Sequence, residues 1–167
     1  MDVLVRAVNA ALFVSHGIRR DTDITLHLCG GPGPDRRIRF NGETLSGVRP
    51  DERSIAGQIK AILKRPVPTV GVPDEVTQGI FDMGGGFQET LTEWREEGVS
   101  TYILDAQGEG VATLPKDGHL GFVLSDHQPF TEAENQQIAP FTKVSLGNQW
   151  LQGHACITVV QHTLDNL

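Results

Sequence analysis

Short apolar runs alternate with helical patterns through the second half of the chain, and this order constrains the fold more than any other feature. We expect the apolar, β-rich runs at 101–104, 121–124 and 141–146 to form strands. Helices are predicted at 87–97, 131–140 and 150–162, the second opened by a capping box of Thr131 and Glu134. Strands alternating with helices are typical of an α/β domain with a largely parallel sheet.

The first half of the chain contributes further predicted elements. Helices are expected at 2–17 and from Pro50 to about residue 63, the second capped by Asp51, with strands at 23–29 and 79–83. A hairpin is predicted to join 36–40 to the residues around Leu45, because Asn41-Gly42 is a strong signal for a two-residue turn. The glycines at 84–86 lack the Lys and Ser/Thr of a phosphate-binding loop and indicate a flexible turn.

Length and composition favour one cytoplasmic domain, residues 1–167. With 38% hydrophobic residues the chain can bury a core, and its apolar runs are too short to span a membrane. Cys29 and Cys156 are too few for a disulfide framework, and neither they nor the histidines have the spacing of metal ligands. We therefore expect reduced thiols and no metal.

Charge is distributed unevenly along the chain. Residues 1–65 contain 11 Lys and Arg against 7 Asp and Glu, whereas the rest contains 3 against 14. Arginine side chains suit phosphate oxygens, and those of the first part include Arg19, Arg20, Arg36, Arg37, Arg39, Arg49 and Arg53. Residues 1–65 are therefore the expected nucleic-acid-facing part, and the alternative is a solvated charged surface.

The three strands of the second half end in loops of similar character. These are Leu104-Asp105, Leu124 to His127, and Leu146 to Asn148. Ligands of open α/β sheets bind outside the carboxyl ends of adjacent strands, so the loops form one pocket if the strands are neighbours. Ser145-Leu146-Gly147 would expose main-chain groups beside an apolar side chain, which suits a flat ring such as adenine. The alternative is an ordinary turn between core elements.

Six segments, taken in order, resemble the archaeal tRNA (pseudouridine(54)-N1)-methyltransferases of the SPOUT superfamily. The segments are 2–21, 50–54, 102–105, 122–127, 144–147 and Cys156. The resemblance covers essentially the whole chain and implies a mainly parallel sheet flanked by helices, with a C-terminal trefoil knot in the region 100–167. The family usually has Gly where Ser125 stands, an aromatic residue where Thr158 stands, and an additional N-terminal stretch containing its first strand.

The resemblance also implies the cofactor, the reaction and the partners. S-adenosylmethionine would be held in the knot by Leu104, Leu124, Ser125, Ser145, Leu146, Gly147, Leu151 and Cys156. The reaction would methylate N1 of pseudouridine in the TΨC arm of tRNA. The contacts expected with RNA are Arg6, Asn9, Arg19, Arg20 and Arg53. A homodimer is implied, with Trp150, Ile157, Val160 and Leu164 as candidate interface residues.

Catalytic candidates and rival functions stay open at this point. Asp126 or His127 could accept the N1 proton, or could form a loop-stabilising pair. Arg19 and Asp21 could contact phosphate and base, or could be a charge pair at a helix end. Cys156 is interpreted as a packing group, because no activating base accompanies it. The alternatives are a SPOUT methyltransferase for another tRNA or rRNA nucleotide and a non-catalytic domain that binds RNA or nucleotide.

Overall fold

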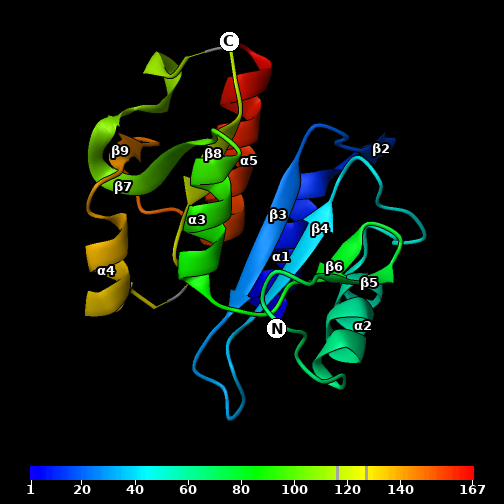
Figure 1. The fold of residues 1–167 in the computed structure, drawn as a ribbon. Helices are drawn as coiled ribbons and strands as arrows, with labels where there is room; N and C mark the ends of the chain where they lie inside the picture. Colours follow the sequence, from blue (N-terminus) through cyan, green and yellow to red (C-terminus); the bar gives the residue numbers. More distant parts are fainter. Residues whose placement is uncertain (116, 127) are drawn as a thin grey trace. The chain divides into compact units, whose positions relative to one another are not determined.

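The computed structural model describes residues 1–115, 117–126 and 128–167, and the chain divides into two compact units, Met1–Glu89 and Thr90–Leu167. None of the helices among these residues has the length and apolar character that a membrane crossing requires. Each unit has its own sheet (Figure 1). The assignment of 1–167 as one domain stays a prediction.

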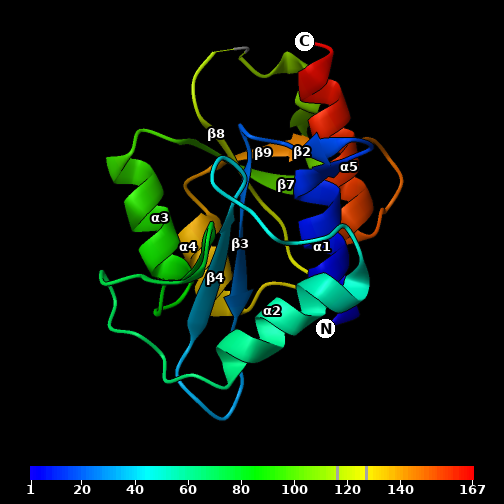
Figure 2. The ribbon, with the colours of Figure 1, turned by 90° about the vertical axis from the view of Figure 1, so that its right-hand side faces the viewer.

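The first unit is built on a four-stranded antiparallel sheet in the order β3-β4-β6-β5. Helix α1 packs on α2 and on β3, and α1 lies beside β3 in both views (Figure 2). The elements are α1 (Asp2–Leu12), β1 (Phe13–Val14), β2 (Gly17–Ile18), β3 (Asp23–Leu28), β4 (Arg36–Asn41), α2 (Glu52–Leu63), β5 (Asp74–Thr77) and β6 (Ile80–Asp82), followed by α3 (Phe87–Glu96), which crosses the boundary.

Two predictions in the first unit were wrong. The first helix ends at Leu12 rather than residue 17, because Phe13 is already extended and pairs with Ile18 in a short hairpin. Asn41-Gly42 does not connect two paired strands, since β4 pairs with β3 and β6 instead. A Cβ at Gly42 would collide with the carbonyl oxygens of Arg19 and Thr22, so this glycine serves a close backbone approach. The predicted Asp51 cap is confirmed, as its carboxylate accepts a hydrogen bond from the Ser54 amide.

The second unit carries the predicted parallel sheet, in the order β8-β7-β9. Its elements are β7 (Ser100–Gly110), the 3-10 helix η1 (Val111–Thr113), β8 (Leu120–Val123), α4 (Glu132–Ile138), β9 (Thr142–Ser145) and α5 (Gly153–Asp165). The Thr131–Glu134 capping box is confirmed. The α/β class with a parallel sheet beside helices is therefore confirmed (Figure 1), whereas the sheet of the first unit is antiparallel. Threading of the C-terminal segment into a knot stays a prediction.

Candidate functional site

The carboxyl ends of the three parallel strands lie at one edge of the second sheet. β7 is the central strand, with Ile103 in register with Val123 of β8 and Leu104 in register with Val144 of β9. The condition set by the sequence, that these strands be neighbours, is therefore met. Because parallel strands present their carboxyl ends to the same edge, the predicted segment at Leu104-Asp105 lies there with the residues that follow β8 and β9. The expectation that the central strand ends at this segment was wrong, since β7 continues to Gly110.

An apolar cluster supports this edge from within the sheet. Val144 is almost fully buried with Val111 and Leu114, and four half-buried side chains pack against them, namely Tyr102, Leu104, Phe122 and Leu146. The rings of Tyr102 and Phe122 stack with centroids 5.8 Å apart. Two of the predicted cofactor residues, Leu104 and Leu146, thus belong to one cluster and offer an apolar surface at the sheet edge.

The turn after β9 has the backbone form that the sequence suggested. Gly147 adopts φ +113°, a conformation that L side chains rarely take. Its amide donates a hydrogen bond of 3.1 Å to Oγ of Ser145, which lies 3.3 Å from the Gly147 carbonyl oxygen. A Cβ added at Gly147 would meet no atom within 4 Å. The main chain of this turn therefore borders open space beside Leu146.

The start of α5 brings four further predicted residues together. A Cβ at Gly153 would lie 3.5 Å from Cδ1 of Leu124 and 4.0 Å from the carbonyl oxygen of Ser125. One turn later, the Cys156 thiol points to the carbonyl oxygen of Leu151 at 3.7 Å. Burial raises the pKa of the Cys156 thiol, so it stays protonated at neutral pH. This state agrees with its interpretation as a packing group.

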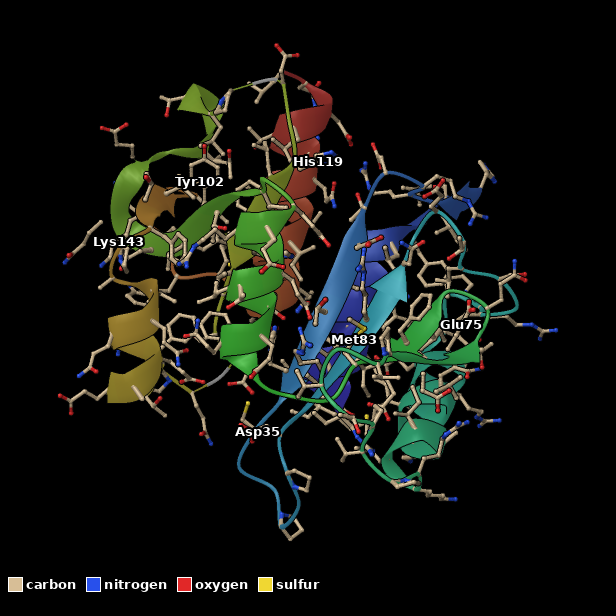
Figure 3. The ribbon with its side chains drawn as sticks, in the orientation of Figure 1. Asp35, Glu75, Met83, Tyr102, His119 and Lys143 are labelled. Atoms are coloured by element: carbon tan, nitrogen blue, oxygen red, sulfur yellow. The ribbon has the colours of Figure 1, made fainter. Side chains whose placement is uncertain are left out.

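Strand β7 contains an irregularity that sequence reasoning missed. Val144 of β9 is in register with both Leu104 and Glu109, so the intervening residues of β7 leave the regular ladder. A Cβ at Gly108 would collide with the backbone of Lys143 and Val144, so the excursion lies directly on β9. Nζ of Lys143 binds Oδ2 of Asp105 at 2.7 Å at the start of the excursion. The sequence drew attention to Asp105, but only the fold reveals its partner Lys143, which is labelled in Figure 3.

The arginines of the first unit divide into buried and accessible groups. Arg36 and Arg37 are 4% and 1% exposed, and the guanidinium of Arg36 donates to the carbonyl oxygens of Ile62 and Arg65 at the end of α2. Nε of Arg37 donates to the Gly84 carbonyl oxygen. Assigning these two side chains to phosphate docking was therefore wrong, because they satisfy backbone acceptors inside the unit.

Three of the predicted RNA contacts, Arg6, Asn9 and Arg20, lie nearer the surface and have partners of their own. Arg6 pairs with Glu52 at 3.6 Å, and Nδ2 of Asn9 donates to the Pro50 carbonyl oxygen. Nη1 of Arg20 reaches the carbonyl oxygens of the 42–45 turn, at Gly42, Glu43 and Leu45. Arg53 is exposed on α2.

The four catalytic candidates do not all fall within one unit. Arg19 and Asp21 belong to the first unit, where Asp21 is exposed and accepts a hydrogen bond from the Thr22 hydroxyl at 3.3 Å. Asp126 lies in the second unit, directly after the cofactor candidate Ser125, and its Oδ1 accepts a hydrogen bond from the Gln128 amide at 2.8 Å. His127 lies outside the described residues. No group of three or more metal-ligating side chains occurs among the residues that are described.

Comparisons with known proteins give one consistent family. Residues 1–167 match the family described as "Putative SAM-dependent RNA methyltransferase". The tRNA (pseudouridine(54)-N(1))-methyltransferase of Methanocella arvoryzae is 36% identical over 168 residues, which cover 99% of this chain and 84% of that protein. The Haloferax volcanii protein of the same name is 35% identical, covering 99% and 82%.

A solved structure has a fold similar to that of this chain. Archaeoglobus fulgidus Nep1 bound to S-adenosylhomocysteine superimposes with a TM-score of 0.69, covering 99% of this chain and 69% of that one. The sequence identity of the pair is 17%, so this likeness concerns the fold alone.

Proposed function

The chain belongs to the SAM-dependent RNA methyltransferase family that it matches along its full length, and from this premise we propose that it methylates N1 of pseudouridine 54 in the TΨC loop of tRNA. The observation that carries the proposal is the 36% identity with a methyltransferase of that name, sustained over 99% of the chain. We propose that the cofactor binds at the carboxyl ends of the parallel strands of the second unit, where β7 lies between β8 and β9.

The residues at this edge fit S-adenosylmethionine. Leu104 and Leu146 provide apolar surface for an adenine ring, and the open space at Gly147 lets a ligand approach the main chain. Leu124, Ser125, Ser145, Leu151 and Cys156 complete the proposed contacts. When bound, the cofactor supplies a methyl group on a positively charged sulfur. The protein's main contribution is to hold the acceptor nitrogen in line with the methyl group and the sulfur.

The proposed chemistry needs a proton acceptor but no covalent enzyme intermediate. N1 of pseudouridine loses a proton as the methyl group arrives, and Asp126 is the proposed acceptor, with His127 as the neighbouring candidate. Arg19 and Asp21 are proposed to contact phosphate and base. The protonated Cys156 thiol is a poor nucleophile, which favours direct transfer.

A homodimer is proposed for the assembled enzyme. Trp150 is 92% exposed and the adjacent Leu151 is 40% exposed, which leaves an apolar patch just before α5. Val160 is 5% exposed within the chain and therefore belongs to its core, so we withdraw it from the interface candidates and keep Ile157, Leu164 and Trp150. Light scattering tests this assembly, and Trp150→Ser should shift the mass toward that of one chain. We propose a cytoplasmic location, where tRNA is modified.

A methyl-transfer assay tests the proposed activity. The protein is incubated with radiolabelled S-adenosylmethionine and T-arm RNA containing either pseudouridine or uridine at position 54. Label should enter only the pseudouridine RNA, because uridine is attached to its ribose through N1 and offers no N–H there. Label on another nucleotide would support a different substrate, and binding of S-adenosylhomocysteine without transfer to any RNA would support a non-catalytic domain. Either outcome contradicts the proposal.

A further inference from the structure

The outer surface of α2 carries a row of cations. Arg53, Lys60 and Lys64 are all exposed, and their separations of 7 and 11 residues place the two lysines about 20° to either side of Arg53 around the helix axis. The row extends about 16 Å along the helix at 1.5 Å per residue. The opposite side of α2 buries Ile55, Ile59 and Ile62 in the core of the first unit, which fixes the row on its outer side.

Among the residues that the structure describes, no acid forms an ion pair with this row. Glu52 is the only carboxylate in α2, and it is paired with Arg6 of α1. Arg65, the next cation along the chain, is bound to Asp74. The side chains of Arg53, Lys60 and Lys64 make no hydrogen bond or ion pair with any described residue. Their charges therefore remain available to an external anion.

A glycine stands within the same row. Gly57 is exposed in the middle of α2, where glycine weakens a helix relative to alanine. A Cβ at Gly57 would meet no atom within 4 Å, and its φ is not positive, so neither packing nor backbone conformation within the chain requires glycine here. Because Gly57 has no side chain, the helix backbone is uncovered between Arg53 and Lys60. A partner can therefore approach the helix closely at that point.

We propose that Arg53, Gly57, Lys60 and Lys64, here called the α2 stripe, form a track for the phosphate backbone of the tRNA substrate. A sugar-phosphate strand presents evenly spaced negative charges, which suit a linear row of cations flanking a flat segment. The proposal adds Lys60 and Lys64 to the residues that contact RNA, although neither of them was predicted there from the sequence. This inference rests on the proposed function, since it concerns the same substrate.

The first test removes the two lysines. Lys60→Gln with Lys64→Gln should raise the Kd for tRNA about tenfold and lower the slope of log K against log salt by about 1.4 to 1.8, since each phosphate contact contributes about 0.7 to 0.9. Arg95→Gln, at an exposed position of α3 without a described partner, is the control and should leave both quantities unchanged. An unchanged Kd and slope in the double variant would overturn the proposal.

The second test uses Gly57→Ala. This variant should raise the thermal midpoint by about 3 °C, because alanine favours the helix and its Cβ meets no clash. The Kd for tRNA should nevertheless rise severalfold, because the Cβ stands where the strand approaches. A stabilised variant with unchanged tRNA affinity would remove the close approach from the proposal. Reduced tRNA binding by these variants, together with pseudouridine methylation by the wild-type protein, would support both the track and the proposed function. Absence of methyl transfer by the wild-type protein would contradict the proposed function, whatever the variants bind.

Discussion

Lys143 and Asp105 form an ion pair between neighbouring parallel strands, with Nζ of Lys143 2.7 Å from Oδ2 of Asp105. Oδ1 of the same carboxylate accepts a hydrogen bond of 2.9 Å from the Gln107 amide. Asp105 directly follows Leu104 of the proposed cofactor site. The pair therefore fastens the excursion of β7 onto β9 at the point where the cofactor would bind.

Lys143→Met should release the excursion and weaken cofactor binding. The exposed pair contributes a modest free energy, so we expect the Kd for S-adenosylhomocysteine to rise about threefold. Calorimetry measures this change, and Lys143→Arg is the control that keeps the charge. The hydrogen bond from Lys143 holds the pKa of Asp105 below its ordinary value, so the stabilisation is present above about pH 4 and lost as pH falls through the lowered pKa. If the affinity for S-adenosylhomocysteine fell equally with decreasing pH in Lys143→Met and in Lys143→Arg, this role of the ion pair would be contradicted.

Gly147→Ala tests the turn after β9. Alanine at φ +113° forces the backbone to rearrange, and this should lower the free energy of unfolding by about 1 to 2 kcal/mol. Binding of S-adenosylhomocysteine should be largely lost as well. Gly118→Ala is a matched control, because Gly118 has φ +98° and equally open surroundings but precedes the amino end of β8, whereas the proposed site is at the carboxyl ends of the strands. Similar affinity in the two variants would exclude Gly147 from the site.

Cys156 should react more slowly than Cys29 with iodoacetamide at pH 8. Cys29 is exposed, whereas burial raises the pKa of the Cys156 thiol and lowers its thiolate fraction. Peptide mapping by mass spectrometry gives the two rates. In the transfer assay, Cys156→Ser should weaken cofactor binding while turnover persists, because direct transfer does not pass through a thioether. Complete loss of turnover with intact cofactor binding would indicate a nucleophilic cysteine.

Asp126→Asn should lower the rate of methyl transfer about a hundredfold, which is the usual effect of losing a general base. The affinity for S-adenosylhomocysteine should stay within a factor of about two, because the amide preserves the shape of the side chain. Single-turnover kinetics separate the chemical step from binding. His127→Gln is the comparison variant, and a larger rate loss there would transfer the proton-accepting role to His127.

Arg36→Met should destabilise the protein far more than Arg39→Met. Arg36 lies 3.5 Å from buried Asp82, and its removal leaves that carboxylate uncompensated, which costs about 3 to 5 kcal/mol. Arg39 pairs with Asp23 near the surface, where the loss is about 1 kcal/mol or less. Urea unfolding measures both values.

The same pair predicts a pH dependence of unfolding. Burial raises the pKa of Asp82, and the nearby Arg36 guanidinium opposes that rise. A raised carboxyl pKa gives stability that is present below about pH 4 and lost as pH increases through the raised value. In Arg36→Met, the free energy of unfolding should therefore fall more steeply between pH 4 and 7 than in the wild type. If the free energy of unfolding depended on pH equally in Arg36→Met and in the wild type, the coupling between Arg36 and Asp82 would be contradicted.

Local sequence patterns predicted most elements of the second unit. The Thr131–Glu134 capping box starts α4 because its hydrogen bonds join residues three apart. The runs around Ile103 and Val144 became buried strands, as their apolar character indicated. Strand β5 was missed, since Asp74–Thr77 is polar and gains its strand conformation from pairing with β6.

The sequence by itself determined the alternation of helices and strands, the family, and the set of residues proposed to meet the cofactor. Each depends on spacing or residue type along the chain. Only the tertiary structure decided that Arg36 and Arg37 are buried, that Lys143 binds Asp105, and that β7 departs from its ladder around Gly108. Those features depend on contacts between residues far apart in the chain, and local propensity carries no record of which distant groups meet when the core closes.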